Sequence, residues 1–122
     1  MKGQLAWLPE PMRLLLLKTL ARKAQRELLT ERTNLELFLR HHSTSRLMEQ
    51  NVPEKRATEA VQLLHVAVTF YTSAHISLNR LLGTTDIHDA ARHSTTSRHY
   101  AQKGAEAINE ARETLSCFGV TV

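Results

Sequence analysis

The sequence contains few residues that interrupt helices, with four glycines and three prolines among 122 residues. A β-sandwich or barrel needs a turn every few residues, so this scarcity excludes both. The single cysteine, Cys117, excludes a disulfide framework and a thiolate metal site. It also favours a reducing compartment, so we expect a cytoplasmic protein. The longest aliphatic run, Leu14 to Leu17, is too short to span a bilayer, and we expect no membrane partner.

An excess of positive charge is present instead, with a formal net charge of +4. It is concentrated near the N-terminus, where residues 1–30 hold six Lys/Arg and two acidic residues. From residue 84 onward, four Lys/Arg face five acidic residues. This asymmetry favours a polyanionic partner for the first part of the chain. The length predicts a single domain over residues 1–122, with residues 1–10 as an N-terminal arm.

The first half of the chain predicts two helices. Pro9 and Pro11 are typical of a first helical turn, and an apolar stripe follows them as far as Leu28. The stretch from Thr33 to Glu36 has the form of a capping box, which predicts a second helix at about 34–50. This helix could also continue the first. Trp7 precedes the first helix, and we expect it to pack on the bundle as a hydrophobic staple.

The third predicted helix, at about 53–82, carries two adjacent apolar stripes, which indicates burial against partners on two sides. The two stripes consist of Ala57, Val61, Leu64, Val68, Tyr71, His75, Leu78 and Leu82, and of Ala60, Leu63, Ala67, Phe70, Ala74, Ser77 and Leu81. We therefore expect this helix to be central. Gly83 is expected to supply its left-handed C-terminal cap.

The fourth predicted helix, at about 87–118, carries a stripe whose middle members are small, including Ser94, Ser97 and Gly104. Small residues let a neighbouring helix approach closely, and we expect Phe70 and Tyr71 to fill the space opposite. The sequence thus predicts an all-α protein, a compact four-helix bundle whose spine is the antiparallel hairpin of residues 53–82 and 87–118.

Two similar segments, RHHSTSR at 40–46 and RHSTTSRHY at 92–100, stand out. Extended, residues 33–50 align with residues 85–102, and a true duplication would give two similar polar faces. Three interpretations stay open for these segments. They could be solvated helix surface, they could bind anions through Arg and hydroxyl donors, or the second could be catalytic.

The interpretation we favour is a small basic, non-catalytic helical subunit that acts by binding within a larger assembly. Its partners would be the backbone of a nucleic acid, contacted without sequence specificity, and other proteins; a homo-oligomer stays open. We expect no cofactor and no metal site, because no ligand spacing typical of metals occurs. The predicted nucleic-acid-binding residues are Lys18, Arg22, Arg26, Arg40, Arg46, Arg92 and Arg98.

An enzymatic alternative depends on Arg92 and His99, which are separated by six residues. This pair resembles the Arg-x(4–6)-His motif of HEPN ribonucleases, which are small all-α proteins that act as dimers. The resemblance implies metal-independent RNA cleavage, with His99 in acid–base catalysis and Arg92 stabilising charge on the scissile phosphate. A second alternative is a helical protein–protein adaptor of a secretion or plasmid-transfer system.

Overall fold

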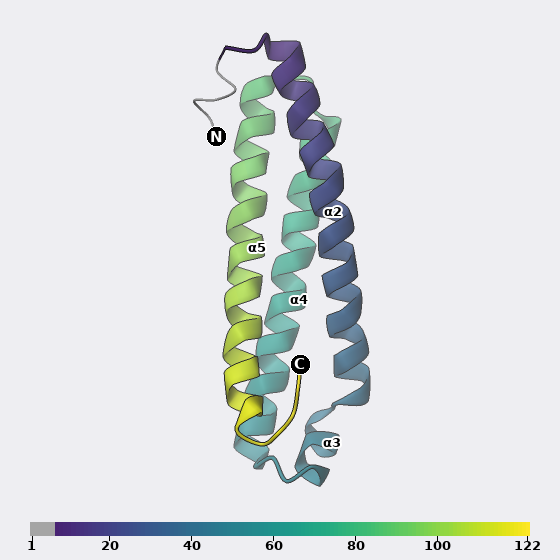
Figure 1. Ribbon diagram of the computed structural model, residues 1–122, viewed down its shortest axis with the longest axis vertical. Helices are drawn as coiled ribbons and strands as arrows, with labels where there is room; N and C mark the ends of the chain where they lie inside the picture. The colour runs from purple at the N-terminus through teal and green to yellow at the C-terminus, as the bar shows by residue number, and fades with distance from the viewer. Residues whose placement is uncertain (1–6) are drawn as a thin grey trace.

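Four helices form the structure of residues 7–122 in a computed structural model (Figure 1). They are α2 (Glu10–His41), α3 (Thr44–Glu49), α4 (Glu54–Gly83) and α5 (Ile87–Ser116), and no strand occurs within the described range. The protein is an all-α helical bundle, and the predicted hairpin is confirmed as α4 and α5. Helix α2 runs antiparallel to α4, while the short α3 lies at the lower end of the bundle in Figure 1.

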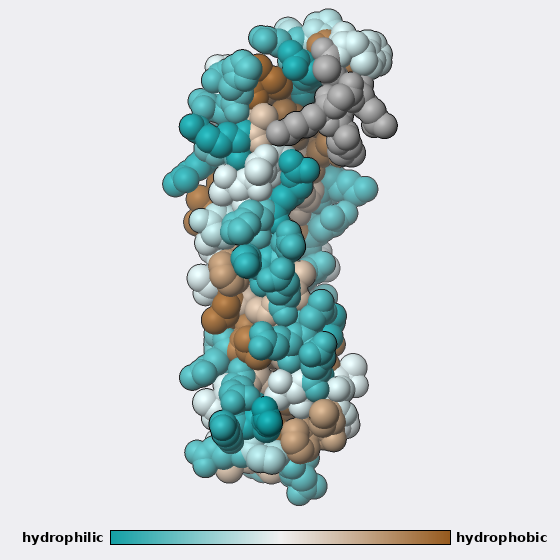
Figure 2. Space-filling model, turned by 90° about the vertical axis from the view of Figure 1, so that its left-hand side faces the viewer, coloured by the Kyte–Doolittle hydropathy of each residue, from teal (hydrophilic) through white to brown (hydrophobic). Residues whose placement is uncertain are grey.

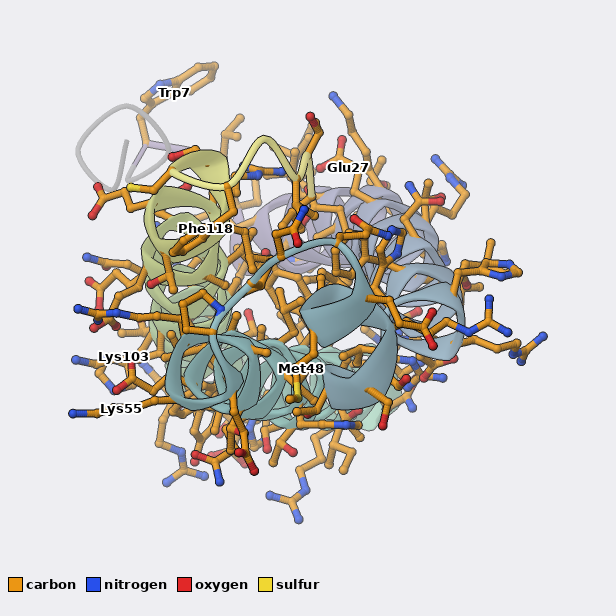
Figure 3. All side chains as sticks on the ribbon, turned by 90° about the horizontal axis from the view of Figure 1, so that it is seen from below. Trp7, Glu27, Met48, Lys55, Lys103 and Phe118 are labelled. Atoms are coloured by element: carbon orange, nitrogen blue, oxygen red, sulfur yellow. The ribbon has the colours of Figure 1, made fainter. Side chains whose placement is uncertain are left out.

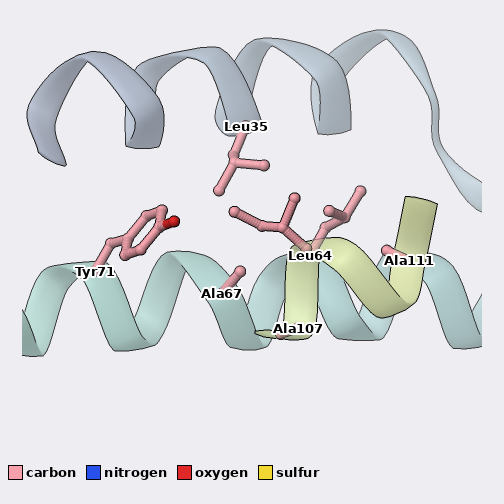
Figure 4. Packing of buried hydrophobic residues seen from close by; sticks show 7 residues of the cluster. Leu35, Leu64, Ala67, Tyr71, Ala107 and Ala111 are labelled. Carbon is pink, nitrogen blue, oxygen red and sulfur yellow. The ribbon is translucent and has the colours of Figure 1, made fainter. Parts of the chain in front are cut away.

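Helix α4 is central, as its two stripes predict. It contacts α2, α3 and α5, and no residue of either stripe is exposed. Figure 4 shows part of the resulting core, in which Leu35 of α2 points toward Leu64 of α4. A second cluster, around Leu47 and Leu115, holds α3 and the end of α5 against the start of α4. Burial of these apolar side chains is the main force that assembles the bundle.

The small-residue strip of α5 faces α4, as expected. A Cβ atom placed on Gly104 would lie 2.6 Å from Cε1 of Tyr71 and 2.8 Å from its Cδ1. Tyr71 therefore fills the space that the missing side chain leaves. Phe70 packs against the ring of Tyr100, one turn nearer the start of α5, with ring centroids 6.3 Å apart. Tyr100 is not part of the small-residue strip, so the expectation is confirmed for Tyr71 alone.

The predicted break before residue 34 is wrong, and the alternative of one continuous helix is confirmed as far as His41. Glu36, which a capping box would use to bind the Thr33 amide, instead lies 3.6 Å from the guanidinium of Arg32. Leu35 is buried in the core, so packing on α4 favours continued helix. The chain leaves the helix at His42, and Ser43 then caps α3 by accepting a hydrogen bond from the Arg46 amide.

Two further expectations about helix ends and the N-terminal arm are wrong. Gly83 is the last residue of α4, and its φ angle is not positive, so it does not form a left-handed cap. Among the described residues, positive φ angles occur at Asn51 and Gly119. Trp7 is 78% exposed and points away from the helices, so it is no staple (Figure 3). Residues 1–6 of the predicted arm lie outside the described residues. At the start of α5, Asp86 caps the helix by accepting a hydrogen bond from the His88 amide, 3.2 Å away.

Candidate nucleic-acid interface

A row of basic residues follows one side of α2. Lys18, Arg22 and Arg26 recur every four residues, so each lies about 40° around the helix from the one before it. Arg40 follows Arg22 by eighteen residues, or five turns at about 3.6 residues per turn, and so points the same way. We call Lys18, Arg22, Arg26 and Arg40 the basic ridge. Because α2 is continuous, the ridge extends over roughly 33 Å at 1.5 Å per residue.

The basic ridge is accessible, and none of its cations forms an ion pair with the described residues. Arg22, Arg26 and Arg40 are exposed and Lys18 is half-buried. Among residues 7–122, no carboxylate lies within 4.0 Å of any of these four cations. The ion pairs that do form use other basic residues, such as Arg32 with Glu36 and Lys103 with Glu106. The ridge thus keeps its charge free for an external anion.

The other three predicted nucleic-acid-binding residues lie elsewhere. Arg46 is exposed on α3, at the lower end of the bundle. Arg98 lines a groove between α2 and α5, which is on a different side of α2 from the basic ridge. Arg92 is already paired, with its Nη2 atom 2.7 Å from Oδ1 of Asp89. The seven residues therefore do not form one surface.

The two similar segments fold differently. The first contains the break between α2 and α3, whereas the second lies wholly within α5. In the first, the Ser43 hydroxyl accepts from a backbone amide and starts a new helix. In the second, the hydroxyls of Thr95 and Ser97 donate to the preceding carbonyls of Ala91 and Ser94. The same residue types thus cap a helix in one place and continue it in the other, and the two segments present no matching polar faces.

Arg92 and His99 both lie on the outer face of α5. They are exposed, as are His88, Thr95 and Glu106 on the same face. Figure 2 views the molecule from this side and shows a mostly hydrophilic surface along it. Two helical turns, or about 10.5 Å of rise, separate Arg92 from His99. A joint action on one phosphate would therefore need a second chain, as the resemblance to HEPN ribonucleases implies.

This ribonuclease alternative makes a testable prediction. Because Asp89 already binds Arg92, we expect the wild-type protein to leave structured RNA uncleaved in the presence of a metal chelator. His99→Ala should behave identically and keep the wild-type melting temperature, because the side chain is exposed. Cleavage by the wild type that disappears in both His99→Ala and Arg92→Ala, with melting temperatures unchanged, would instead establish the catalytic pair.

Three polar side chains that the sequence analysis did not predict as a site lie together in a second groove, nearer the lower end of the bundle between α2 and α5. Glu31, Tyr71 and Arg112 line this lower groove, whose volume is about 460 Å³, together with Val122 of the C-terminal tail. Burial, together with the carboxylate of Glu31, raises the pKa of the Tyr71 hydroxyl well above its usual range, and Arg112 partly offsets the rise. The phenol therefore stays protonated near neutral pH.

The described residues contain neither a cluster of metal ligands nor a helix able to cross a membrane. No three His, Cys, Asp or Glu side chains of residues 7–122 gather closely enough to bind a metal ion. In the same range, every helix is too short or too polar to cross a bilayer. The single cysteine, Cys117, is exposed and unpaired.

Fold and surface together define the class of this protein as an all-α helical bundle with a charged ridge along its first long helix. Comparisons with known protein families, with curated proteins and with solved structures find no match to the chain.

Proposed function

We propose that the protein is a non-catalytic helical subunit that binds the backbone of a nucleic acid through the basic ridge of α2, within a larger assembly. The observation that carries this proposal is the absence, in residues 7–122, of any carboxylate within 4.0 Å of the four ridge cations. A cation that already has a partner must give it up to bind phosphate. Lys18, Arg22, Arg26 and Arg40 have none to give up.

The form of the ridge favours backbone contact over base reading. Its cations are spread along one side of a long helix, as suits a row of phosphates that are about 3.4 Å apart along one strand of a duplex. Long basic side chains in such a row position a protein on nucleic acid but read no bases. The unpaired thiol of Cys117 agrees with a cytoplasmic location, which is part of the proposal.

Salt-dependent binding tests the proposal. Fluorescence anisotropy with labelled single-stranded RNA, single-stranded DNA and duplex DNA would give the affinity at several salt concentrations. We expect the triple variant Lys18→Ala/Arg22→Ala/Arg26→Ala to flatten the log–log salt dependence by about two to three units, because each lost phosphate contact removes roughly 0.7–0.9. Its fold should be unchanged, because these side chains are half-buried or exposed.

A matched control removes the same charge elsewhere. Lys55, Arg56 and Lys103 are exposed, and Figure 3 shows Lys55 and Lys103 projecting from the side of the bundle away from α2. Changing all three to Ala should leave the salt slope near the wild-type value. Equal losses in both triple variants would mean that net charge alone attracts the nucleic acid. Undetectable binding of all three probes at low salt would overturn the proposal.

A further inference from the structure

The first halves of α2 and α5 are separated by an open groove, which we call the upper groove. Its volume is about 480 Å³. Leu78 and Leu81 of α4 form its floor, Leu17 and Ala24 belong to its α2 wall, and Ala91 belongs to its α5 wall. At the other end of the molecule, the C-terminal tail turns back between α5 and α2, and Val122 packs against the core there (Figure 1). No comparable segment of the described chain covers the upper groove.

The shape of the upper groove suits a helix. Its walls contain small residues at helical spacing, Ala21 and Ala24 on α2 and Ala91 and Ser94 on α5. These small side chains let the backbone of an added helix approach α2 and α5. Larger residues would leave room only for single side chains of a partner. Residues 13–24 of α2 border the groove, which corresponds to about three turns and roughly 17 Å. A helix lying there would complete a bundle of four long helices.

The charge of the upper groove indicates which charged side chains a bound helix should carry. Arg13, His88 and Arg98 line the groove, and no residue that lines it is acidic. The Nε atom of Arg13 is buried and has no hydrogen-bond partner among the described residues; Glu10 lies 3.8 Å from its Nη2 atom. Arg98 has no carboxylate within 4.0 Å in residues 7–122. A carboxylate from outside could satisfy these donors.

Acidic residues line the crevice between α2 and α5 only beyond the upper groove, toward the middle of the two helices. Glu27 and Glu31 line the next segment, which Arg98 also borders. The α2–α5 crevice is therefore cationic toward the start of both helices and acidic toward the middle. A partner helix with acidic residues would match the upper part alone, which fixes where it should lie along the crevice.

Exposed apolar surface continues beyond the groove over the start of α2. Leu20 lines the groove and is 49% exposed, and Met12 and Leu16 are 53% and 39% exposed. Neighbouring exposed apolar residues of this size are typical of an interaction surface. A second copy of this chain is a poor occupant, because Arg13 lies among the apolar residues that its own α2 would insert, with Lys18 and Arg22 farther around the same helix. Cationic side chains would then meet the cationic groove.

We propose that the upper groove binds an amphipathic helix of a partner protein, with an apolar stripe of about three turns flanked by Asp or Glu. The apolar stripe would cover Leu17, Leu20 and Ala91, which line the groove and keep exposed surface, and the acidic flanks would pair with Arg13 and Arg98. This surface is separate from the basic ridge, and it provides the protein contact that a subunit of a larger assembly needs.

Two synthetic helical peptides of about fourteen residues test the proposal. Both carry the same Leu and Ala stripe; one has Glu on its flanks and the other has Lys. Titration at low salt should show the Glu peptide binding about tenfold or more tightly than the Lys peptide. Arg98→Glu should weaken binding of the Glu peptide by about tenfold or more and reduce the preference between peptides. Arg98→Ala gives a smaller loss with less risk to the fold.

Lys103→Glu is the matched control, because it makes the same charge change on α5, at a residue paired with Glu106 and absent from the groove walls. It should change the affinity for the Glu peptide by less than about twofold. The variant with all of Lys18, Arg22 and Arg26 changed to Ala should also keep most of the peptide affinity, which separates this proposal from the nucleic-acid proposal.

NMR spectra should place the bound peptide. The methyl signals of Ala24 and Ala91 should shift on binding, while that of Ala107, which is buried in the core, should not. Equal affinities for the two peptides, or no saturable binding at about millimolar concentration, would overturn the proposal. So would a Lys103→Glu effect as large as that of Arg98→Glu. A dimer that Ala91→Glu dissociates would identify a second copy as the occupant instead.

Discussion

Replacing Gly104 by Ala is expected to destabilise the bundle by about 1–3 kcal/mol, and Gly104→Leu by more. Elsewhere in a helix interior, Gly→Ala stabilises by about 0.5–1 kcal/mol, because the unfolded chain loses freedom. At Gly104 the added Cβ would lie 2.6 Å from Cε1 and 3.3 Å from Cζ of Tyr71. That ring is buried in the core cluster with Leu35, Leu64 and Ile108, so a movement away from α5 would disturb this packing. Steric overlap should therefore outweigh the propensity gain.

Gly83→Ala is the matched control for this prediction. No atom lies within 4 Å of the position that its Cβ would take, and its φ angle is not positive. We expect this variant to be unchanged or stabilised by up to about 1 kcal/mol. Urea denaturation gives both free energies of unfolding. If Gly104→Ala proved as stable as Gly83→Ala, the close approach of α5 to Tyr71 would be contradicted.

A double variant identifies Tyr71 as the cause. Tyr71→Leu removes the ring atoms that a new Cβ at Gly104 would meet. In the Tyr71→Leu background, Gly104→Ala should therefore cost less than it does alone. Coupling of roughly 0.5–3 kcal/mol is typical of residues in direct contact. Additive effects would point to backbone distortion elsewhere in α5.

The features predicted correctly from the sequence are those that depend on periodicity over a long helix. Two uninterrupted stripes made α4 central, and the small strip of α5 placed Gly104 opposite an aromatic residue. Such patterns average over many residues, so a local exception changes little. The start of the second predicted helix depended on four residues, and there the tertiary contact of Leu35 decided the outcome.

The candidate sites were harder to predict from the sequence than the fold. The pairing of Arg92 with Asp89 could have been anticipated, since residues three apart on a helix are neighbours. The upper groove could not, because it depends on how far α2 diverges from α5, and no local pattern encodes that separation. One signal was nevertheless present. Arg13 lies in register with the apolar residues Leu17 and Ala24, which is an unusual place for a guanidinium.

The two proposed surfaces assign different sides of α2 to different partners. The basic ridge and the upper groove both use residues between 13 and 26, but residues 17 and 18 point about 100° apart. Nucleic acid on the ridge and a helix in the groove could therefore bind at the same time. Such an arrangement would make α2 the element that connects a nucleic acid to a protein assembly.

The short helix α3 offers the second large expected effect, because a single side chain anchors it. Six residues cannot form a stable helix in isolation. Leu47 has no exposed surface and packs with Val52, Ala57 and Leu115. Leu47→Ala would remove this contact and leave a cavity, and we expect a loss of about 2–5 kcal/mol. The neighbouring Met48 is 44% exposed on α3, at the lower end of the molecule (Figure 3), so Met48→Ala should stay within about 0.5 kcal/mol of wild type.

Urea denaturation measures both losses, and hydrogen exchange shows where they act. In Leu47→Ala, the amides of Leu47 and Gln50, which donate to Ser43 and Arg46 carbonyls, should exchange faster relative to those in the middle of α4. Met48→Ala should leave this ratio unchanged. A free energy of unfolding for Leu47→Ala that matches Met48→Ala would mean that α3 does not pack on α4 in solution. The chain from residue 42 to residue 53 would then be a connection between α2 and α4, and Arg46 would lose its fixed position relative to the basic ridge.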